Sequence, residues 1–134
     1  MQKASVHKRQ SELNEEAAKN AAQSGLYDWA VTICFYSALH YIEAYAKHQG
    51  VNIGREYSQC KTQHERRFYY VQDIDYDLGL NDSLINAYDK LYQGSKIARY
   101  LEGIQSMTAR KYFESVYMQY LKALEIIKNK IGSF

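Results

Sequence analysis

Three basic side chains and a histidine lie close together between positions 61 and 67, in the order Lys61, His64, Arg66 and Arg67. His64 would fall in the first turn of a predicted helix, where the helix dipole favours anions. A phosphate group of a nucleotide or of RNA could therefore bind at this helix end. The alternative is an ordinary helix start whose basic neighbours are solvated. His64, Arg66 and Arg67 are thus candidate ligand-binding residues.

A second candidate group follows later in the chain, at Lys96, Arg99 and Tyr100. The two cations could contact phosphate, and a tyrosine ring can stack on a nucleic-acid base. The alternative for Arg99 is a buried pair with a carboxylate, and the alternative for Tyr100 is a place in the core. We predict no catalytic residue in either group.

The sequence predicts no metal site and no cofactor. Cys34 and Cys60 lack a C-x-x-C spacing, and no cluster of cysteine and histidine has metal-ligand spacing. The alternating aspartates of residues 73–77 lack the glycine and the closing glutamate of a calcium loop. No glycine-rich phosphate loop occurs. His40 lies in an apolar segment, where it could be catalytic or act as a dimer switch, although a core histidine is the more usual interpretation.

Length and charge describe one domain spanning residues 1–134. The 17 basic and 15 acidic residues give a formal net charge of +2, so nonspecific binding to duplex nucleic acid is not expected. The charge is uneven, with five basic against two acidic residues in 47–70, and five aspartates against one lysine in 71–90. No secretory signal or apolar run of about 18 residues is found. With only two cysteines, we expect a cytoplasmic protein without a membrane span.

Helical periodicity, seven glycines and the absence of proline predict an all-α protein. Glycine commonly ends a helix because it enters the left-handed region without steric cost. Long helices with short links favour antiparallel neighbours, so we predict an antiparallel bundle of four to five helices. The predicted helices cover about residues 4–24, 28–48, 62–72, 82–103 and 108–130.

The second predicted helix should be the central one. Residues 28–48 are apolar nearly all round, which is typical of a helix packed on several sides, and Asp28 is a plausible N-cap. Gly94, inside a later helix, predicts either a kink or the close approach of another helix.

The connections carry fewer signals. Residues 50–61 are predicted as a loop, and Thr62 with Glu65 forms the pattern of a capping box at the start of the third helix. Residues 73–82 are predicted as an acidic turn or a partly helical link.

Three segments together resemble the HEPN domain family. Residues 29–45, from Trp29 to Tyr45, resemble the central helix of that family. The segment Lys61-Thr-Gln-His64 resembles the Thr-His that often opens its next helix. Leu91-Tyr92 followed by Ala98-Arg99-Tyr100 resembles a segment of one HEPN branch. The resemblance covers roughly residues 10–130.

The resemblance implies an all-α bundle of four or five helices, commonly a homodimer. Many family members are metal-independent ribonucleases, in which an arginine is followed after four to six residues by a histidine. The histidine moves protons while the arginine holds the phosphate. No arginine of this chain has a histidine at that spacing, and Gly94 and Arg99 stand where the pair is expected.

We therefore expect a noncatalytic HEPN-like binding module for RNA, a nucleotide or a protein partner. The alternative is a metal-independent ribonuclease with a displaced active site, such as His64 with Arg99. The resemblance also implies a nucleotidyltransferase as a partner protein, or a role in defence or in a toxin–antitoxin system.

Overall fold

The computed structural model describes residues 3–104 and 107–134, and every regular element in these ranges is a helix. This confirms the predicted all-α class. Five of these helices are longer than ten residues, and α3 and α6 are short. They are α1 (Ala4–Gln23), α2 (Tyr27–His48), α3 (Ile53–Glu56), α4 (Gln63–Asp77), α5 (Ser83–Tyr100), α6 (Ala109–Glu114) and α7 (Tyr117–Lys130).

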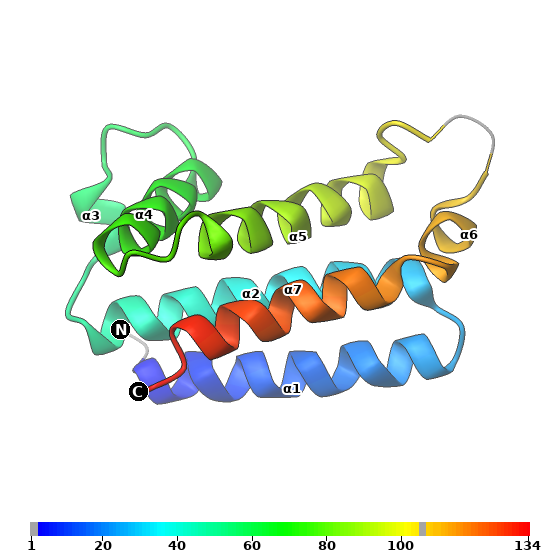
Figure 1. The fold of residues 1–134 in the computed structure, drawn as a ribbon, viewed down its shortest axis with the longest axis horizontal. Helices are drawn as coiled ribbons and strands as arrows, with labels where there is room; N and C mark the ends of the chain where they lie inside the picture. Colours follow the sequence, from blue (N-terminus) through cyan, green and yellow to red (C-terminus); the bar gives the residue numbers. More distant parts are fainter. Residues whose placement is uncertain (1–2, 105–106) are drawn as a thin grey trace.

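Helices α1, α2, α5 and α7 alternate in direction and form an antiparallel bundle (Figure 1). α2 contacts α1, α5, α6 and α7, and half of its residues are buried, so the predicted central helix is confirmed. α4 packs on α5 at one end of the bundle and α3 packs on α4, whereas α6 lies at the opposite end. Within the described ranges, no helix combines the length and apolarity needed to cross a membrane.

Two serines join α1 to α2. Ser11 Oγ donates to the carbonyl oxygen of Ser37 at 2.7 Å, and Ser37 Oγ donates to that of Ser11 at 2.7 Å. The small side chains let the two backbones approach, and each buried hydroxyl is satisfied. Ser11 and Ala18 are the buried residues of α1. Because this helix buries so little of its own surface, its position is set mainly by its contacts with α2.

The N-terminus of α5 is capped by a residue of α4. Asp75, which is buried, accepts a hydrogen bond from the amide of Asp82 at 2.8 Å. Its second oxygen accepts from the amides of Leu84 and Ile85 at 2.8 and 2.9 Å. One carboxylate thereby satisfies three amides at a helix start, which otherwise lack intrahelical partners.

Gly94 confirms the predicted close approach of another helix. A Cβ atom at this position would lie 2.9 Å from Tyr120 Cδ1 and 3.1 Å from Val31 Cγ1, and it would press still closer on Tyr120 Cε1. Because the tyrosine ring is itself buried, it has no free space to move into. Glycine at this position therefore lets α5 pack closely against both α2 and α7.

Helix starts were predicted with mixed success. Thr62 Oγ1 accepts from the amide of Glu65 at 3.1 Å, which confirms one half of the capping box; among the described residues Glu65 makes no return bond to the Thr62 amide. Asp28 is not the N-cap of α2, since the helix begins at Tyr27 with Leu26 before it. Asp28 lies in the first turn and pairs with Arg110 at 3.2 Å, so its carboxylate ties the start of α2 to the start of α6 instead.

Several predicted boundaries were wrong. The single helix predicted over 108–130 is divided into α6 and α7, because the backbone tightens to i→i+3 bonding at Val116. The predicted loop 50–61 contains α3, which Asn52 caps through the amide of Arg55 at 3.1 Å. α4 extends beyond the predicted end at residue 72, and α5 ends with Leu101 in a left-handed conformation before Gly103.

Candidate anion-binding site

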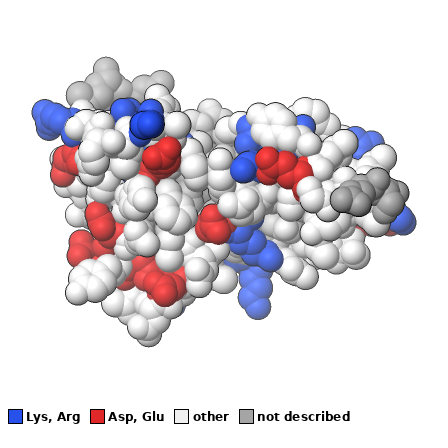
Figure 2. Space-filling view, turned by 90° about the horizontal axis from the view of Figure 1, so that it is seen from above, with Lys and Arg blue, Asp and Glu red and all other residues white. Residues whose placement is uncertain are grey.

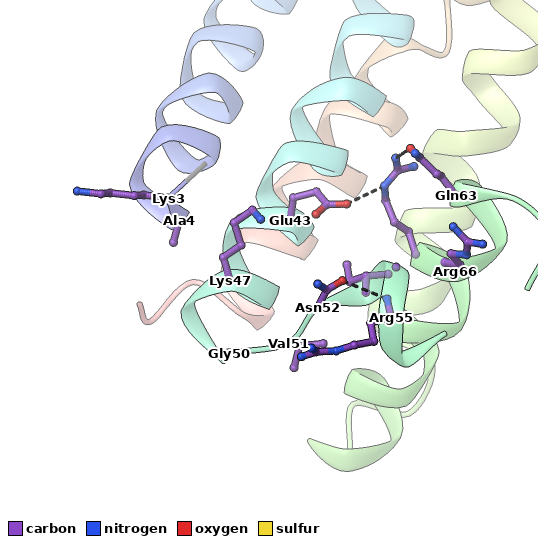
Figure 3. A pocket seen from close by; sticks show the side chains of 13 residues that line it. Lys3, Ala4, Glu43, Lys47, Gly50, Val51, Asn52, Arg55, Gln63 and Arg66 are labelled. Atoms are coloured by element: carbon purple, nitrogen blue, oxygen red, sulfur yellow. Dashed lines mark hydrogen bonds and ion pairs between the residues drawn. The ribbon is translucent and has the colours of Figure 1, made fainter. Parts of the chain in front are cut away.

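A pocket of about 740 Å³ lies where the end of α2, the turn of α3 and the start of α4 meet the first turn of α1. In Figure 3, Glu43 and Lys47 of α2 lie on one side of it, and Asn52 and Arg55 lie on the other. Lys3 points away from the other side chains in this view. We call this the basic pocket, because its lining holds one carboxylate, Glu43, and five cations: Lys3, Lys47, Arg55, Arg66 and Arg67.

Arg67 is the most firmly held of these cations. Its Nε donates to Glu43 Oε1 at 3.0 Å, and its Nη2 donates to Gln63 Oε1 at 3.1 Å. The arginine side chain keeps only 14% of its surface exposed. Within residues 3–104 and 107–134 the other four cations make no ion pair, so the pocket has a clear excess of positive charge.

Two further arginines are positioned by local backbone structure. Arg66 Nε donates to the carbonyl oxygen of Cys60 at 3.2 Å, which ties the start of α4 to the preceding loop. Arg55 lies in the single turn of α3, whose start is held from both sides. Asn52 Oδ1 accepts from the amide of Arg55, and the amide of Asn52 donates to Glu56 Oε2 at 3.1 Å. These turns bring cations that are distant in sequence to one pocket.

The charges of α4 run against its helix dipole. Glu65 in the first turn follows the usual preference, but Arg66 and Arg67 come directly after it and Asp75 and Asp77 lie in the last turn, whereas a helix favours the opposite arrangement. Figure 2 shows a group of acidic side chains at one corner of the α4 end, and basic side chains with some acidic ones beside them at the other corner. The dipole and the arginines therefore both attract an anion to the same end of α4. Local rules of this kind are commonly broken at functional sites.

His64 does not line the basic pocket. Its ring stacks on that of Tyr92, with the centroids 3.4 Å apart and the planes at 12°, and its Nδ1 atom is buried without a hydrogen-bond partner among the described residues. Burial is the largest cause that lowers the pKa of His64, and Arg67 adds to it. The imidazole is consequently neutral at pH 7, so it adds no positive charge for a phosphate.

Lys96, Arg99 and Tyr100 form a separate cluster on the second half of α5. Lys96 Nζ lies 3.4 Å from a carboxylate oxygen of Glu102. Arg99 donates to the carbonyl oxygen of Ser95 at 3.2 Å and to the hydroxyl of Tyr36 at 3.4 Å, and its Cζ lies 5.0 Å from the centre of the exposed Tyr100 ring. The six predicted residues are thus divided, with only Arg66 and Arg67 in the basic pocket.

A histidine pair beside the basic pocket was not predicted. His7 of α1 and His40 of α2 approach with their Nδ1 atoms 3.0 Å apart. The pair lies one turn from pocket residues on both helices, because Lys3 precedes His7 and Glu43 follows His40. Among the described residues, no group of three histidine, cysteine or acidic side chains is arranged to hold a metal ion.

Sequence reasoning also missed Lys3, Glu43, Lys47 and Arg55 as pocket residues. The excess of basic residues in 47–70 was the available signal, but it does not specify which side chains meet. No protein-family model matches the chain, and no curated protein matches it.

Proposed function

We propose that the chain is a noncatalytic HEPN-like helical module that binds the phosphate groups of an RNA or a nucleotide in the basic pocket. The observation that carries this proposal is the charge of the pocket lining. Four cations, Lys47, Arg55, Arg66 and Arg67, come from three helices, and Lys3 adds a fifth at the edge. The single carboxylate of the lining already pairs with Arg67.

The geometry of Arg67 suits phosphate recognition. Its guanidinium is fixed by Glu43 and Gln63, so little conformational freedom is lost when an anion binds beside it. Arginine also presents several N–H donors in a planar fork that fits phosphate oxygens. Lys47 and Arg55 are less constrained and supply charge. We expect binding to weaken as salt rises, because these cations are partly exposed.

The noncatalytic part of the proposal is supported by the packing at Gly94. The HEPN resemblance puts the ribonuclease arginine at this position, but Tyr120 and Val31 already occupy the space that its side chain needs. Arg99, at the histidine position, has no group that transfers a proton near pH 7. The basic pocket itself offers charge and amide groups and is not lined by histidine.

The alternative ribonuclease, with His64 and Arg99 as its displaced pair, has less support. His64 stacks on Tyr92, and its Nδ1 atom has no hydrogen-bond partner among the described residues, so Arg99 does not bond to that atom. Arg99 instead bonds to Tyr36 and to its own helix at Ser95. A proton-transfer group and a phosphate-holding group need one common reacting atom between them.

We also propose a homodimer, as the resemblance implies. Trp29 and Tyr36 lie two turns apart on α2 and are exposed. Arg99 donates to the Tyr36 hydroxyl and lies over the ring of Tyr100, and Tyr100 and Leu101 are exposed as well. An exposed row of large apolar side chains is typical of an interface. A sedimentation mass near 15.6 kDa at high protein concentration would contradict the dimer. A partner nucleotidyltransferase is a further proposal on the resemblance alone.

Binding can be tested by titrating the protein with ATP and with a labelled single-stranded RNA octamer at low salt. We expect saturable binding that the double substitution Arg55→Gln with Arg66→Gln weakens at least tenfold. Lys122→Gln removes an exposed cation outside the pocket and should leave affinity unchanged. Absence of binding by both probes, or an equal loss of affinity in the control variant, would contradict the proposal.

The same RNA serves in a cleavage assay without added metal. We expect no cleavage by the wild-type protein. Cleavage that is lost in both His64→Ala and Arg99→Ala would establish the ribonuclease alternative instead.

A further inference from the structure

The two imidazoles of the histidine pair meet edge to edge. Their Nδ1 atoms are 3.0 Å apart, their ring centroids are 5.3 Å apart, and their planes differ by only 28°. The distance between the ring centres exceeds the distance between the Nδ1 atoms by about twice the distance from an imidazole centre to its nitrogen. Both Nδ1 atoms therefore lie on the line that joins the two ring centres. This is the geometry of an N–H···N hydrogen bond, in which one nitrogen carries hydrogen and the other presents a lone pair.

The first two turns of α1 have few other attachments. Lys3, at the N-cap, makes no side-chain cap bond, and the first turn lacks an acidic residue. The buried residues of this helix, Ser11 and Ala18, come later, and Val6 is half exposed. Lys8 attaches to the C-terminal residue Phe134 rather than to α2: its Nζ donates to the carbonyl oxygen of Phe134 and lies 4.6 Å from the centre of that ring. The His7 contact is therefore the polar attachment of these turns to α2.

The surroundings of the pair resist a second positive charge. Glu43 and Lys47 of α2 and Arg67 of α4 face it, and Lys3 precedes His7 by one turn on α1. Glu43, the single carboxylate of this group, is already bonded to Arg67. Burial is the largest cause that lowers the pKa of both His7 and His40; Lys47 adds to it at His7 and Arg67 adds to it at His40, while Glu43 opposes the shift at both rings without reversing it.

We propose that the His7–His40 pair is an acid-released latch that holds the first two turns of α1 against α2. Near neutral pH one Nδ1–H donates to the other Nδ1. A first added proton can reside on an outward-facing Nε2 and leave the bond intact. When both rings are protonated, each Nδ1 carries hydrogen, so two N–H groups face each other and the attraction becomes repulsion. Residues 4–10 then separate from α2.

Release would also change the basic pocket, because Lys3 and Ala4 line it. An open first turn of α1 removes one wall of the pocket, whereas the Lys3 side chain already points away from the other lining side chains. This consequence rests on the proposed phosphate-binding function, whereas the latch does not, since it needs no ligand.

Amide hydrogen exchange tests the latch without any ligand. The protection of amides in residues 7–10 is compared with that in residues 12–20 at pH 7.5 and pH 5.0, after correction for intrinsic exchange. In the wild-type protein we expect protection of the first set to fall about tenfold more than that of the second, as for the loss of one hydrogen bond.

Substitutions identify the pair as the cause. His40→Gln should reduce the amide protection of residues 7–10 already at pH 7.5, and lowering the pH to 5.0 should then reduce that protection no further. His7→Gln removes the partner on α1 and should give the same result. His48→Gln, at an exposed histidine of α2, should behave as wild type. Equal protection at both pH values in the wild type, or an unchanged fall in both latch variants, would overturn the proposal.

Discussion

Arg67 on α4 donates from Nε to Glu43 Oε1 on α2 across 3.0 Å, and this contact forms one wall of the basic pocket. The carboxylate has two opposing effects. It holds the guanidinium in place, and it reduces the positive charge available to a ligand. Partial burial of both side chains makes the interaction stronger than a typical surface pair.

Glu43→Gln should therefore increase the affinity for phosphate. The amide oxygen can still accept from Arg67, while one negative charge leaves the pocket. Removing a unit charge within about 10 Å of a phosphate changes binding by roughly 1 kcal/mol near a protein surface, so we expect about fivefold tighter binding of ATP. Isothermal titration measures this, with Glu114→Gln as an exposed control outside the pocket. Weaker binding by Glu43→Gln would show that positioning, not charge, governs the site.

Asp75→Asn should destabilise the bundle. The carboxylate satisfies the amides of Asp82, Leu84 and Ile85 inside a buried site, and an asparagine presents only one acceptor oxygen. An unsatisfied buried amide costs about 1–3 kcal/mol, so urea unfolding should show a loss of that size. Asp77→Asn, exposed in the same turn, is the control and should change stability by less than about 0.5 kcal/mol. Equal losses of stability in the two variants would show that the hydrogen bonds of Asp75 to the start of α5 do not cause the effect.

Gly94→Ala should also destabilise the protein, against the usual preference of helices. In an unhindered helix interior the substitution gains about 1 kcal/mol. Here the added Cβ presses on the buried Tyr120 ring and on Val31, so we expect a net loss of about 1–3 kcal/mol in urea unfolding. Gln93→Ala, on the exposed side of the same helix, should be nearly neutral. A stabilised Gly94→Ala protein would contradict the close approach of α7.

Stability should fall as the pH decreases from about 7.5 towards 5. Burial lowers the pKa of His7, His40 and His64 below the usual 6.5, so the unfolded chain binds protons that the folded protein does not. The stabilisation is complete above the unfolded pKa and is lost as the pH falls through the folded values. The midpoint of urea unfolding should fall less between pH 7.5 and pH 5 in the double variant His7→Gln, His40→Gln than in the wild type. In His48→Gln the midpoint should depend on pH as it does in the wild type.

The fold was largely predictable because the positions of the long helices have local causes, even where their exact boundaries were wrong. Apolar periodicity located the long helices, and Gly25 and Gly50 adopt the left-handed conformation that ends α1 and α2. The break between α6 and α7 left no trace in this pattern. Phe113 and Tyr117 are both buried on either side of it, so the apolar stripe continues through the break.

The candidate site was less predictable because it is assembled from distant segments. The basic excess of residues 47–70 indicated the correct region, and Arg66 and Arg67 were identified within it. Lys3 and Glu43 join the pocket only through helix packing, which sequence spacing does not encode. Arg99 has the right chemistry but faces Tyr36 on another part of the surface.

The position of phosphate binding can be followed residue by residue by amide NMR during a titration with pyrophosphate. We expect saturable shift changes in residues 50–55 and 63–67, which surround the basic pocket. Residues 96–100 should not shift beyond the effect of an equal increase in ionic strength. Shifts concentrated in residues 96–100, or none in the pocket at millimolar pyrophosphate, would contradict an anion site between α2, α3 and α4.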